Sequence, residues 1–197
     1  MRDTGSEIIQ SFFLGLLAEA YQKNGQVEEG LATVAEALAF VERTEERFYE
    51  AELWRIYGEL ALRAGEEAKR RTGEKAKVAP SPDLPVAPSS PEECFLKAIE
   101  ISTKQQAKSL ELRATMSLSR LWQQQALEQS AKSEEVSAGN TEQSAKRQEY
   151  GAGSRKQEAR TKLTEAHKLL SDVYNWFTEG FDTKDLQEAK ALLEELS

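Results

Sequence analysis

The chain has 197 residues, of which 39% are hydrophobic and 30% are charged, and its net charge is −8. This charge is repelled by phosphate backbones and anionic lipid, so we expect no nucleic-acid partner. With one cysteine and one histidine, the chain has too few of these residues for an intrachain disulfide framework or a cysteine/histidine metal site. The residues that favour helices are abundant, and the sequence predicts an all-α protein.

The first helix is predicted at residues 7–23. It is apolar almost all round, and a helix of this kind requires neighbours on every side. We therefore expect an N-terminal docking helix that contacts an upstream segment or a second copy through Ile8, Phe12, Phe13 and Leu16. Acidic residues flank this apolar stretch on both sides, so it does not match a signal peptide. It is also too short to span a membrane. These features predict a cytoplasmic protein with no membrane partner.

A second helix is predicted at residues 27–43, after a break at Asn24-Gly25. Small and large residues recur at helical spacing in both helices: Leu14, Leu17, Ala18 and Tyr21 in the first, and Gly30, Val34, Ala37 and Leu38 in the second. This pattern resembles the tetratricopeptide repeat, in which small residues let two helices approach and large ones fill the space beside them. The two helices are predicted to form a hairpin.

A shift of 40 residues superimposes the third predicted helix, residues 46–68, on the first. Trp54, Tyr57 and Gly58 then fall on the positions of Leu14, Leu17 and Ala18. The partner helix is predicted at residues 91–104, where Ser90, Pro91 and Glu93 provide an N-cap, a first-turn proline and a capping-box acid. The intervening residues 69–90 are basic and then rich in Pro and Ser, which predicts a disordered insertion.

The third hairpin is predicted at residues 107–127 and 158–178. Residues 128–157 between its helices are polar and of low complexity, so we expect a disordered insertion or frayed helix there. The three tryptophans, Trp54, Trp122 and Trp176, recur at packing positions and are predicted to lie in the core.

The last helix, at residues 183–196, is capped by Asp182 or Thr183. It carries an apolar stripe of Leu186, Ala189 and Leu193 opposite a charged face, as suits the end of a solenoid. Together the elements predict a single array over residues 1–197. The expected fold is a tetratricopeptide-like right-handed α-solenoid with three helical hairpins, a C-terminal capping helix and two low-complexity loop insertions.

Long segments also resemble one particular family. Three segments are similar to the C-terminal tetratricopeptide region of large bacterial signalling proteins: FFLGLLAEAYQKNGQVEEGLATVAEALAFVERTEERFYEAELWRIYGELAL, CFLKAIEISTKQQAKSLELRATMSLSRLWQQQ and VYNWFTEGFDTKDLQEAKALLEEL. Those proteins join a class III adenylate/guanylate cyclase domain, or a transcription-regulator module, to a STAND-type ATPase domain. The resemblance implies a region that senses signals or binds partners and restrains the ATPase.

We therefore expect a non-catalytic protein–protein interaction module from a bacterial signalling ATPase or cyclase. The alternative is a regulatory nucleotide-binding or enzymatic fragment of the same parent protein. The sequence contains no GxxxxGK[ST], GxGxxG or GxSxG motif. We accordingly expect no catalytic residues, no cofactor and no metal. His167 is interpreted as a structural residue and Cys94 as a small buried one.

A partner-binding groove is the remaining candidate site. In a tetratricopeptide array the first helix of each hairpin lines the concave face, which here combines charge with some apolar contact and suits a peptide or helix ligand. The alternative is an ordinary solvated surface. The candidate groove residues are Glu19, Lys23, Glu52, Arg55, Glu59, Arg113, Met116, Arg120 and Gln123. The arginines are the first residues to mutate, because arginine is favoured at binding hot spots.

Overall fold

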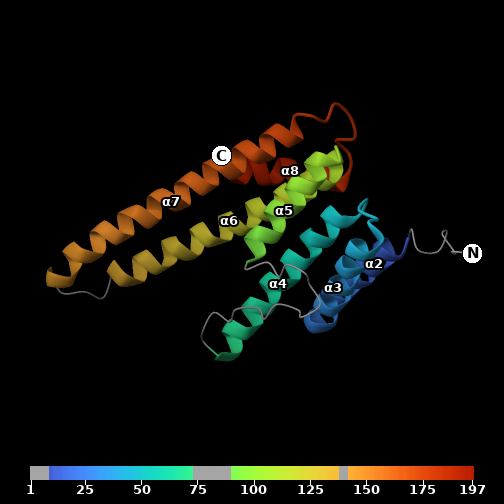
Figure 1. Ribbon diagram of the computed structural model, residues 1–197. Helices are drawn as coiled ribbons and strands as arrows, with labels where there is room; N and C mark the ends of the chain where they lie inside the picture. Colours follow the sequence, from blue (N-terminus) through green and yellow to red (C-terminus); the bar gives the residue numbers. More distant parts are fainter. Residues whose placement is uncertain (1–8, 73–89, 138–141) are drawn as a thin grey trace, which may run out of the picture. The chain divides into compact units, whose positions relative to one another are not determined.

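A computed structural model describes the backbone of residues 9–72, 90–137 and 142–197, and the side chains of residues 9–71, 90–131 and 157–197. Within these ranges the chain is helical and contains no strand, which confirms the all-α expectation. The helices, labelled in Figure 1, are α2 (Gln10–Lys23), α3 (Val27–Thr44), α4 (Glu50–Thr72), α5 (Pro91–Lys104), α6 (Lys108–Ser137), α7 (Glu142–Tyr174) and α8 (Lys184–Glu195).

The chain divides into two compact units, residues 1–114 and 115–197, with the boundary inside α6. In the first unit, α2 packs on α3, α3 on α4 and α4 on α5, while α2 also contacts α4. In the second unit, α8 packs against α7. From α2 to α5, helices that are consecutive in the chain are therefore neighbours in space.

The break between α2 and α3 lies at the predicted position. Gly25 has a φ of +75°, a left-handed conformation that glycine adopts without steric cost, and α2 ends two residues before it. The start of α5 also follows the sequence signals. Ser90 is its N-cap and accepts a hydrogen bond from the backbone N–H of Glu93 at 3.2 Å, and Pro91 occupies the first turn.

Close helix packing in the first unit depends on glycines at helix crossings. A Cβ atom on Gly58 would lie 2.6 Å from Phe95 Cε1 of α5, and one on Gly30 would lie 2.9 Å from Leu60 Cδ2 of α4. Both distances are under 3.0 Å, so a larger residue at either position would force its neighbour to shift. The large side chains of Leu60 and Phe95 are fully buried in the space that the glycines leave.

Two expectations about packing need correction. Trp54 and Trp122 are buried, at 5% and 4% exposure, but Trp176 is 59% exposed. The reason is that α7 ends at Tyr174, so Trp176 lies in the following turn and not on a helix face. In α8 the buried stripe is Leu186, Ala189 and Leu192. Leu193, expected in that stripe, is half-buried.

The structure describes the two predicted insertions to different extents. Across the second, α6 continues to Ser137 and α7 begins at Glu142, so most of residues 128–157 are helical. The physical reason is composition, because Ala, Glu, Gln and Lys predominate there and all favour helix. In the first, α4 extends to Thr72, and the rest of the predicted disordered segment lies outside the described residues. Thr183 occupies the N-cap position of α8, but its hydroxyl donates to the carbonyl of Gly180 instead of capping the helix.

Candidate functional site

Five predicted groove residues form one ion cluster, which we call the α4 charge cluster: Glu19, Glu52, Arg55, Glu59 and Arg113. Arg55 lies at its centre, with Nη2 at 2.8 Å from Glu52 Oε1 and 3.3 Å from Glu19 Oε1, and Nη1 at 2.5 Å from Glu59 Oε1. Helical periodicity explains the arrangement, because residues 52, 55 and 59 follow the i, i+3, i+7 spacing of one helix face.

The cluster joins three helices of the first unit. Glu19 comes from α2, and Arg113, at the start of α6, places Nη1 at 2.8 Å from Glu52 Oε1. Two further residues extend it: Gln22 Nε2 donates to Glu59 Oε2 at 2.9 Å, and Arg63 Nη1 donates to the carbonyl of Gln22 at 2.6 Å. Arg63 and Gln22 were not predicted as site residues, because contacts between helices leave no local signal in the sequence.

Burial makes these ion pairs strong structural contacts. The side chain of Glu52 is fully buried and that of Arg55 is 11% exposed. Burial alone would lower the pKa of Arg55, but the charges and hydrogen bonds of Glu52 and Glu59 raise it above its ordinary value. Burial, and then the negative charges of Glu52 and Glu19, raise the pKa of Tyr49 to about 12, so its hydroxyl stays protonated at neutral pH.

In the first unit, the charged residues predicted to line the groove thus form ion pairs with one another. Removing one partner of a buried pair leaves an uncompensated charge and costs roughly 3–5 kcal/mol. The α4 charge cluster can therefore hold α2, α4 and the start of α6 together, whereas a ligand would have to displace existing pairs. Lys23 lies at the rim, 3.8 Å from Glu19 and 78% exposed.

The remaining three groove residues belong to the second unit, and two of them contact α8. Arg120 Nη2 lies 2.7 Å from Glu188 Oε2, and Gln123 Nε2 donates to Glu195 Oε2 at 3.2 Å. The hydrogen bond from Arg120 holds the pKa of Glu188 below its ordinary value. Met116 is buried, at 3% exposure. Two of these three predicted residues are therefore paired with the last helix.

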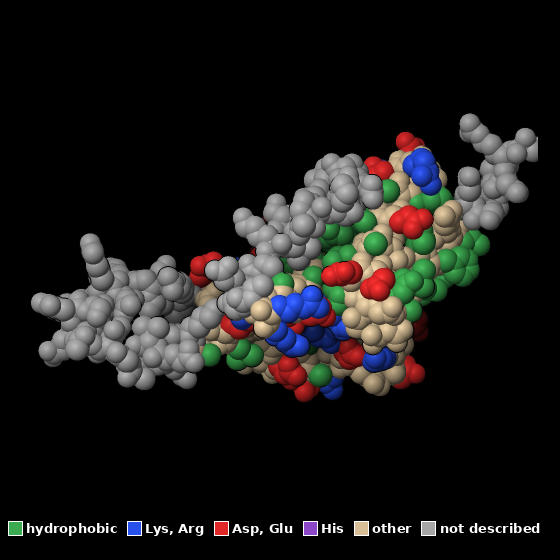
Figure 2. All heavy atoms as spheres, turned by 90° about the horizontal axis from the view of Figure 1, so that it is seen from below, with side chains coloured by type: hydrophobic (Ala, Val, Ile, Leu, Met, Phe, Trp, Pro, Cys, Tyr) green, Lys and Arg blue, Asp and Glu red, His purple; other side chains and the backbone are tan. Residues whose placement is uncertain are grey.

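The predicted docking helix presents an apolar face to solvent. Phe13 is 60% and Leu16 41% exposed, and Ile9 and Leu17, which the prediction did not include, are 45% and 44% exposed. Phe12 is half-buried instead, with its ring centroid 5.1 Å from that of Tyr49. Figure 2 shows hydrophobic side chains gathered at the right-hand edge of the molecule, where α2 lies. Ile8 lies outside the described residues.

The 40-residue shift that superimposes α4 on α2 relates this exposed face of α2 to a buried face of α4. Ile9, Phe13, Leu16 and Ala20, which we call the outward row of α2, correspond to Tyr49, Leu53, Ile56 and Leu60 at or on α4. The second row is packed against the first hairpin. Tyr49 and Leu53 pack closely around Gly15 of α2, Leu60 packs around Gly30 of α3, and Leu53, Ile56 and Leu60 are fully buried. Every member of the outward row is exposed.

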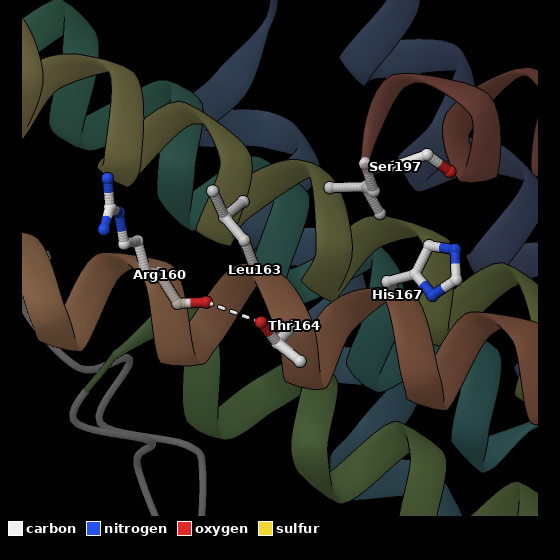
Figure 3. A pocket seen from close by; sticks show the side chains of 6 residues that line it. Arg160, Leu163, Thr164, His167 and Ser197 are labelled. Atoms are coloured by element: carbon white, nitrogen blue, oxygen red, sulfur yellow. Dashed lines mark hydrogen bonds between the residues drawn. The ribbon is translucent and has the colours of Figure 1, made fainter.

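A shallow hollow lies in the second unit, lined by Arg160, Leu163, Thr164 and His167 of α7 with Leu196 and Ser197. Its volume is roughly 570 Å³, and it is open to solvent. Figure 3 shows His167 at the same end of the hollow as Ser197. It also shows the hydrogen bond from the Thr164 hydroxyl to the carbonyl of Arg160, which is 3.0 Å long. The hydroxyl of Ser197 in this lining donates to the carbonyl of Leu193 at 2.8 Å.

Cys94, by contrast, is sealed inside the first unit. It is completely buried, and burial followed by the charge of Glu93 raises its thiol pKa to about 12. A protonated, inaccessible thiol is a poor nucleophile. Among the described residues, no group of three or more His, Cys, Asp or Glu side chains has a geometry that could hold a metal ion.

Comparisons with protein-family models, with curated proteins and with solved structures find no match to this chain. None of the helices in the described ranges combines the length and the apolar character that a membrane crossing requires.

Proposed function

We propose that this chain is a non-catalytic protein-interaction module with tetratricopeptide-like hairpins stacked in a right-handed solenoid. Its interaction surface is the outward row of α2. We propose further that the chain is the C-terminal, partner-binding part of a bacterial signalling ATPase or cyclase that acts in the cytoplasm. The exposed apolar face of α2 is the observation that carries the proposal.

Repetition of the packing supports the array. The step from Ala37 to Trp54 is 17 residues, and so is the step from Ala98 to Thr115, which keeps one register from hairpin to hairpin. Glycines lie at the close crossings of α2 with Tyr49 and Leu53, of α3 with α4, and of α4 with α5. Constant spacing and small residues at each crossing are features of stacked helical repeats.

Register also indicates what the outward row of α2 binds. The equivalent row at α4 packs on a helical hairpin, namely α2 and α3, which offers it Gly15 and Gly30. We infer that α2 accepts a similar hairpin from a partner protein, with small residues at the crossing points. Burying Phe13 and Leu16 in this way would contribute roughly 1.5–3 kcal/mol for each side chain.

The groove prediction receives less support than the outward row. Arg55 and Arg113 are engaged by Glu52, and Arg120 by Glu188. Binding of a peptide to these arginines would exchange internal ion pairs for external ones, with little net gain. The groove residues stay a prediction, whereas the outward row of α2 has apolar area to bury.

Association of the purified chain tests the proposal. Without a partner, the outward row is expected to drive self-association as the concentration rises from about 10 μM to about 500 μM, measured by sedimentation velocity. The double substitution Phe13→Ser, Leu16→Ser is expected to give a monomer. Leu127→Ser, which alters an exposed leucine on α6, is the matched control and leaves association unchanged. A wild-type chain that stays monomeric throughout would contradict the proposal.

A fusion sharpens the test by supplying the proposed type of partner. A second copy of residues 7–46 is placed immediately before residue 7. Each residue of the added hairpin then precedes its original by 40 residues, which is the spacing between α2 and α4. The added copy carries Phe13→Ser and Leu16→Ser, so that it presents no new apolar row. We expect this fusion to be monomeric and its Phe13 amide to exchange more slowly with solvent. Self-association equal to that of the wild type would show that a hairpin of this kind does not cover the row.

A further inference from the structure

The turn between α7 and α8 displays aromatic side chains to solvent. Trp176 is 59% and Phe181 47% exposed, while Tyr174 and Phe177 are half-buried beside them. The ring centroids of Tyr174 and Phe181 are 5.7 Å apart, and those of Trp176 and Phe177 are 5.3 Å apart with the planes at 85°. The turn therefore holds two aromatic pairs, and each pair keeps one ring largely exposed to solvent.

Backbone hydrogen bonds hold this turn in one conformation. The backbone N–H of Trp176 donates to the carbonyl of Val173 at 3.2 Å, and the backbone N–H of Phe177 donates to the carbonyl of Tyr174 at 3.1 Å. Gly180 adopts a φ of +77°, and its carbonyl accepts from the N–H of Thr183 at 2.9 Å. A surface ordered in advance loses little conformational entropy when it binds a ligand.

Three carboxylates lie on the same segment of the chain, one in the last turn of α7 and two in the connection to α8. Asp172, Glu179 and Asp182 are exposed, and no lysine, arginine or histidine occurs from residue 169 to residue 183. Asp172 and Asp182 flank the aromatic segment, and Glu179 lies within it. In the described parts of the chain, none of the three is engaged in an ion pair. This distinguishes them from Glu52 and Glu188, whose charges are compensated by arginines.

Aromatic rings and uncompensated carboxylates favour the same kind of ligand. The face of an aromatic ring carries negative electrostatic potential and attracts guanidinium and ammonium groups, tryptophan most strongly. Carboxylates form charge-assisted hydrogen bonds with the same groups. Anionic lipid would be repelled by the three acids, although exposed Trp and Phe alone would suit a membrane surface. We propose that residues 172–182 bind a basic, arginine-containing segment of a partner protein.

These residues belong to the second unit of the chain, whereas the outward row of α2 belongs to the first. The turn also contains its own reporter. The chain has three tryptophans, and Trp54 and Trp122 are buried at 5% and 4% exposure. Trp176 is the one exposed to solvent, so a ligand that covers the turn changes the emission and the quencher accessibility of Trp176.

The test is a titration of the full-length chain with a hexa-arginine peptide, followed by tryptophan fluorescence and by calorimetry. We expect saturable binding that weakens as salt is added. The triple substitution Asp172→Asn, Glu179→Gln, Asp182→Asn should lower the affinity about tenfold. The matched control Glu28→Gln, Glu29→Gln, Glu36→Gln removes three exposed acids from α3 and should change it less than about twofold.

A second variant separates a specific site from a loss of folding. Trp176→Ala should weaken binding in calorimetry at least about threefold, whereas Phe48→Ala, which also removes an exposed aromatic ring, should leave it unchanged. Circular dichroism confirms that each variant is folded. The proposal is overturned if the two triple variants lose affinity equally, since attraction would then be diffuse. It is also overturned if hexa-arginine gives no saturable signal, or if phosphatidylserine vesicles bind Trp176 and the peptide does not.

Discussion

Helices α2 and α4 carry apolar residues at corresponding positions, yet one row is buried and the other is exposed. Leu53 on α4 packs beside Gly15 and is fully buried, while Phe13, 40 residues earlier, is 60% exposed. The difference lies in the neighbours, since α4 packs against α2, α3 and α5. The same periodicity thus predicts a helix face in both cases, and burial depends on what lies beside that face.

The largest expected effect comes from truncating the buried row. Leu53→Ala should lower the free energy of unfolding by about 3–4 kcal/mol, because it removes apolar contacts and leaves a cavity beside Gly15. Phe13→Ala at the equivalent position of α2 should change it by less than about 0.5 kcal/mol. Urea unfolding followed by circular dichroism measures both. Equal losses would mean that the outward row of α2 is buried in solution.

The next effect tests the charges that join α2 to α4. Arg55→Leu removes the central cation of the α4 charge cluster and leaves Glu52 with Arg113 as its remaining arginine partner. We expect a loss of about 3 kcal/mol, at the lower end for breaking a buried pair because Arg113 remains. Arg71→Leu is the control, since Arg71 is 76% exposed and its pair with Glu67, itself 43% exposed, should contribute at most about 1 kcal/mol. Similar values for both arginines would contradict a buried cluster.

A smaller effect concerns the helix that covers the far side of α4. Ser90→Ala removes the hydroxyl that accepts from the N–H of Glu93 at the start of α5. The expected loss is about 1 kcal/mol, the usual contribution of a serine N-cap. Ser90→Asp restores an acceptor and should recover most of the stability. Thermal unfolding of the three proteins side by side distinguishes a lost cap from a general effect of substitution at residue 90.

The smallest effect lies outside the comparison, in the second unit. Arg120→Gln removes the arginine partner of Glu188. The lowered pKa of Glu188 stabilises the fold at pH values above the ordinary pKa of glutamate, and this stabilisation is lost as the pH falls from there through the lowered pKa. The pKa of Glu188 should rise toward its ordinary value, observed by NMR titration of its carboxyl carbon. Stability at pH 7 should fall by less than about 0.5 kcal/mol, since both side chains are substantially exposed.

The sequence predicted the parts of the fold that depend on local signals. The cap at Ser90, the left-handed turn at Gly25 and the positions of α2 to α5 follow from residue type and spacing. The lengths of α6 and α7 did not follow, because low-complexity sequence with helix-favouring composition was interpreted as a loop. Trp176 was placed in the core because its helix was expected to continue to residue 178, whereas α7 ends at Tyr174.

The candidate site was predicted as a set of positions and not as a set of contacts. Spacing placed Glu52, Arg55 and Glu59 on one helix face, and in the structure Arg55 forms ion pairs with both glutamates. That Arg113 and Glu19 complete their ion pairs depends on how helices cross, which no local pattern encodes. The same limit applies to Arg120 and Glu188, which are 68 residues apart in the chain.

The burial of Cys94 has a kinetic consequence. It is the only thiol in the chain, it packs beside Gly58 between α4 and α5, and its Sγ–H donates to the carbonyl of Ser90 at 3.4 Å. A thiol reagent can reach the sulfur only when these two helices separate. When the reagent reacts with the exposed thiol more slowly than the two helices close again, the labelling rate therefore reports the equilibrium for opening this helix pair. No engineered probe is needed. Comparing that rate with global unfolding would show whether the first unit opens at α5 before it unfolds as a whole.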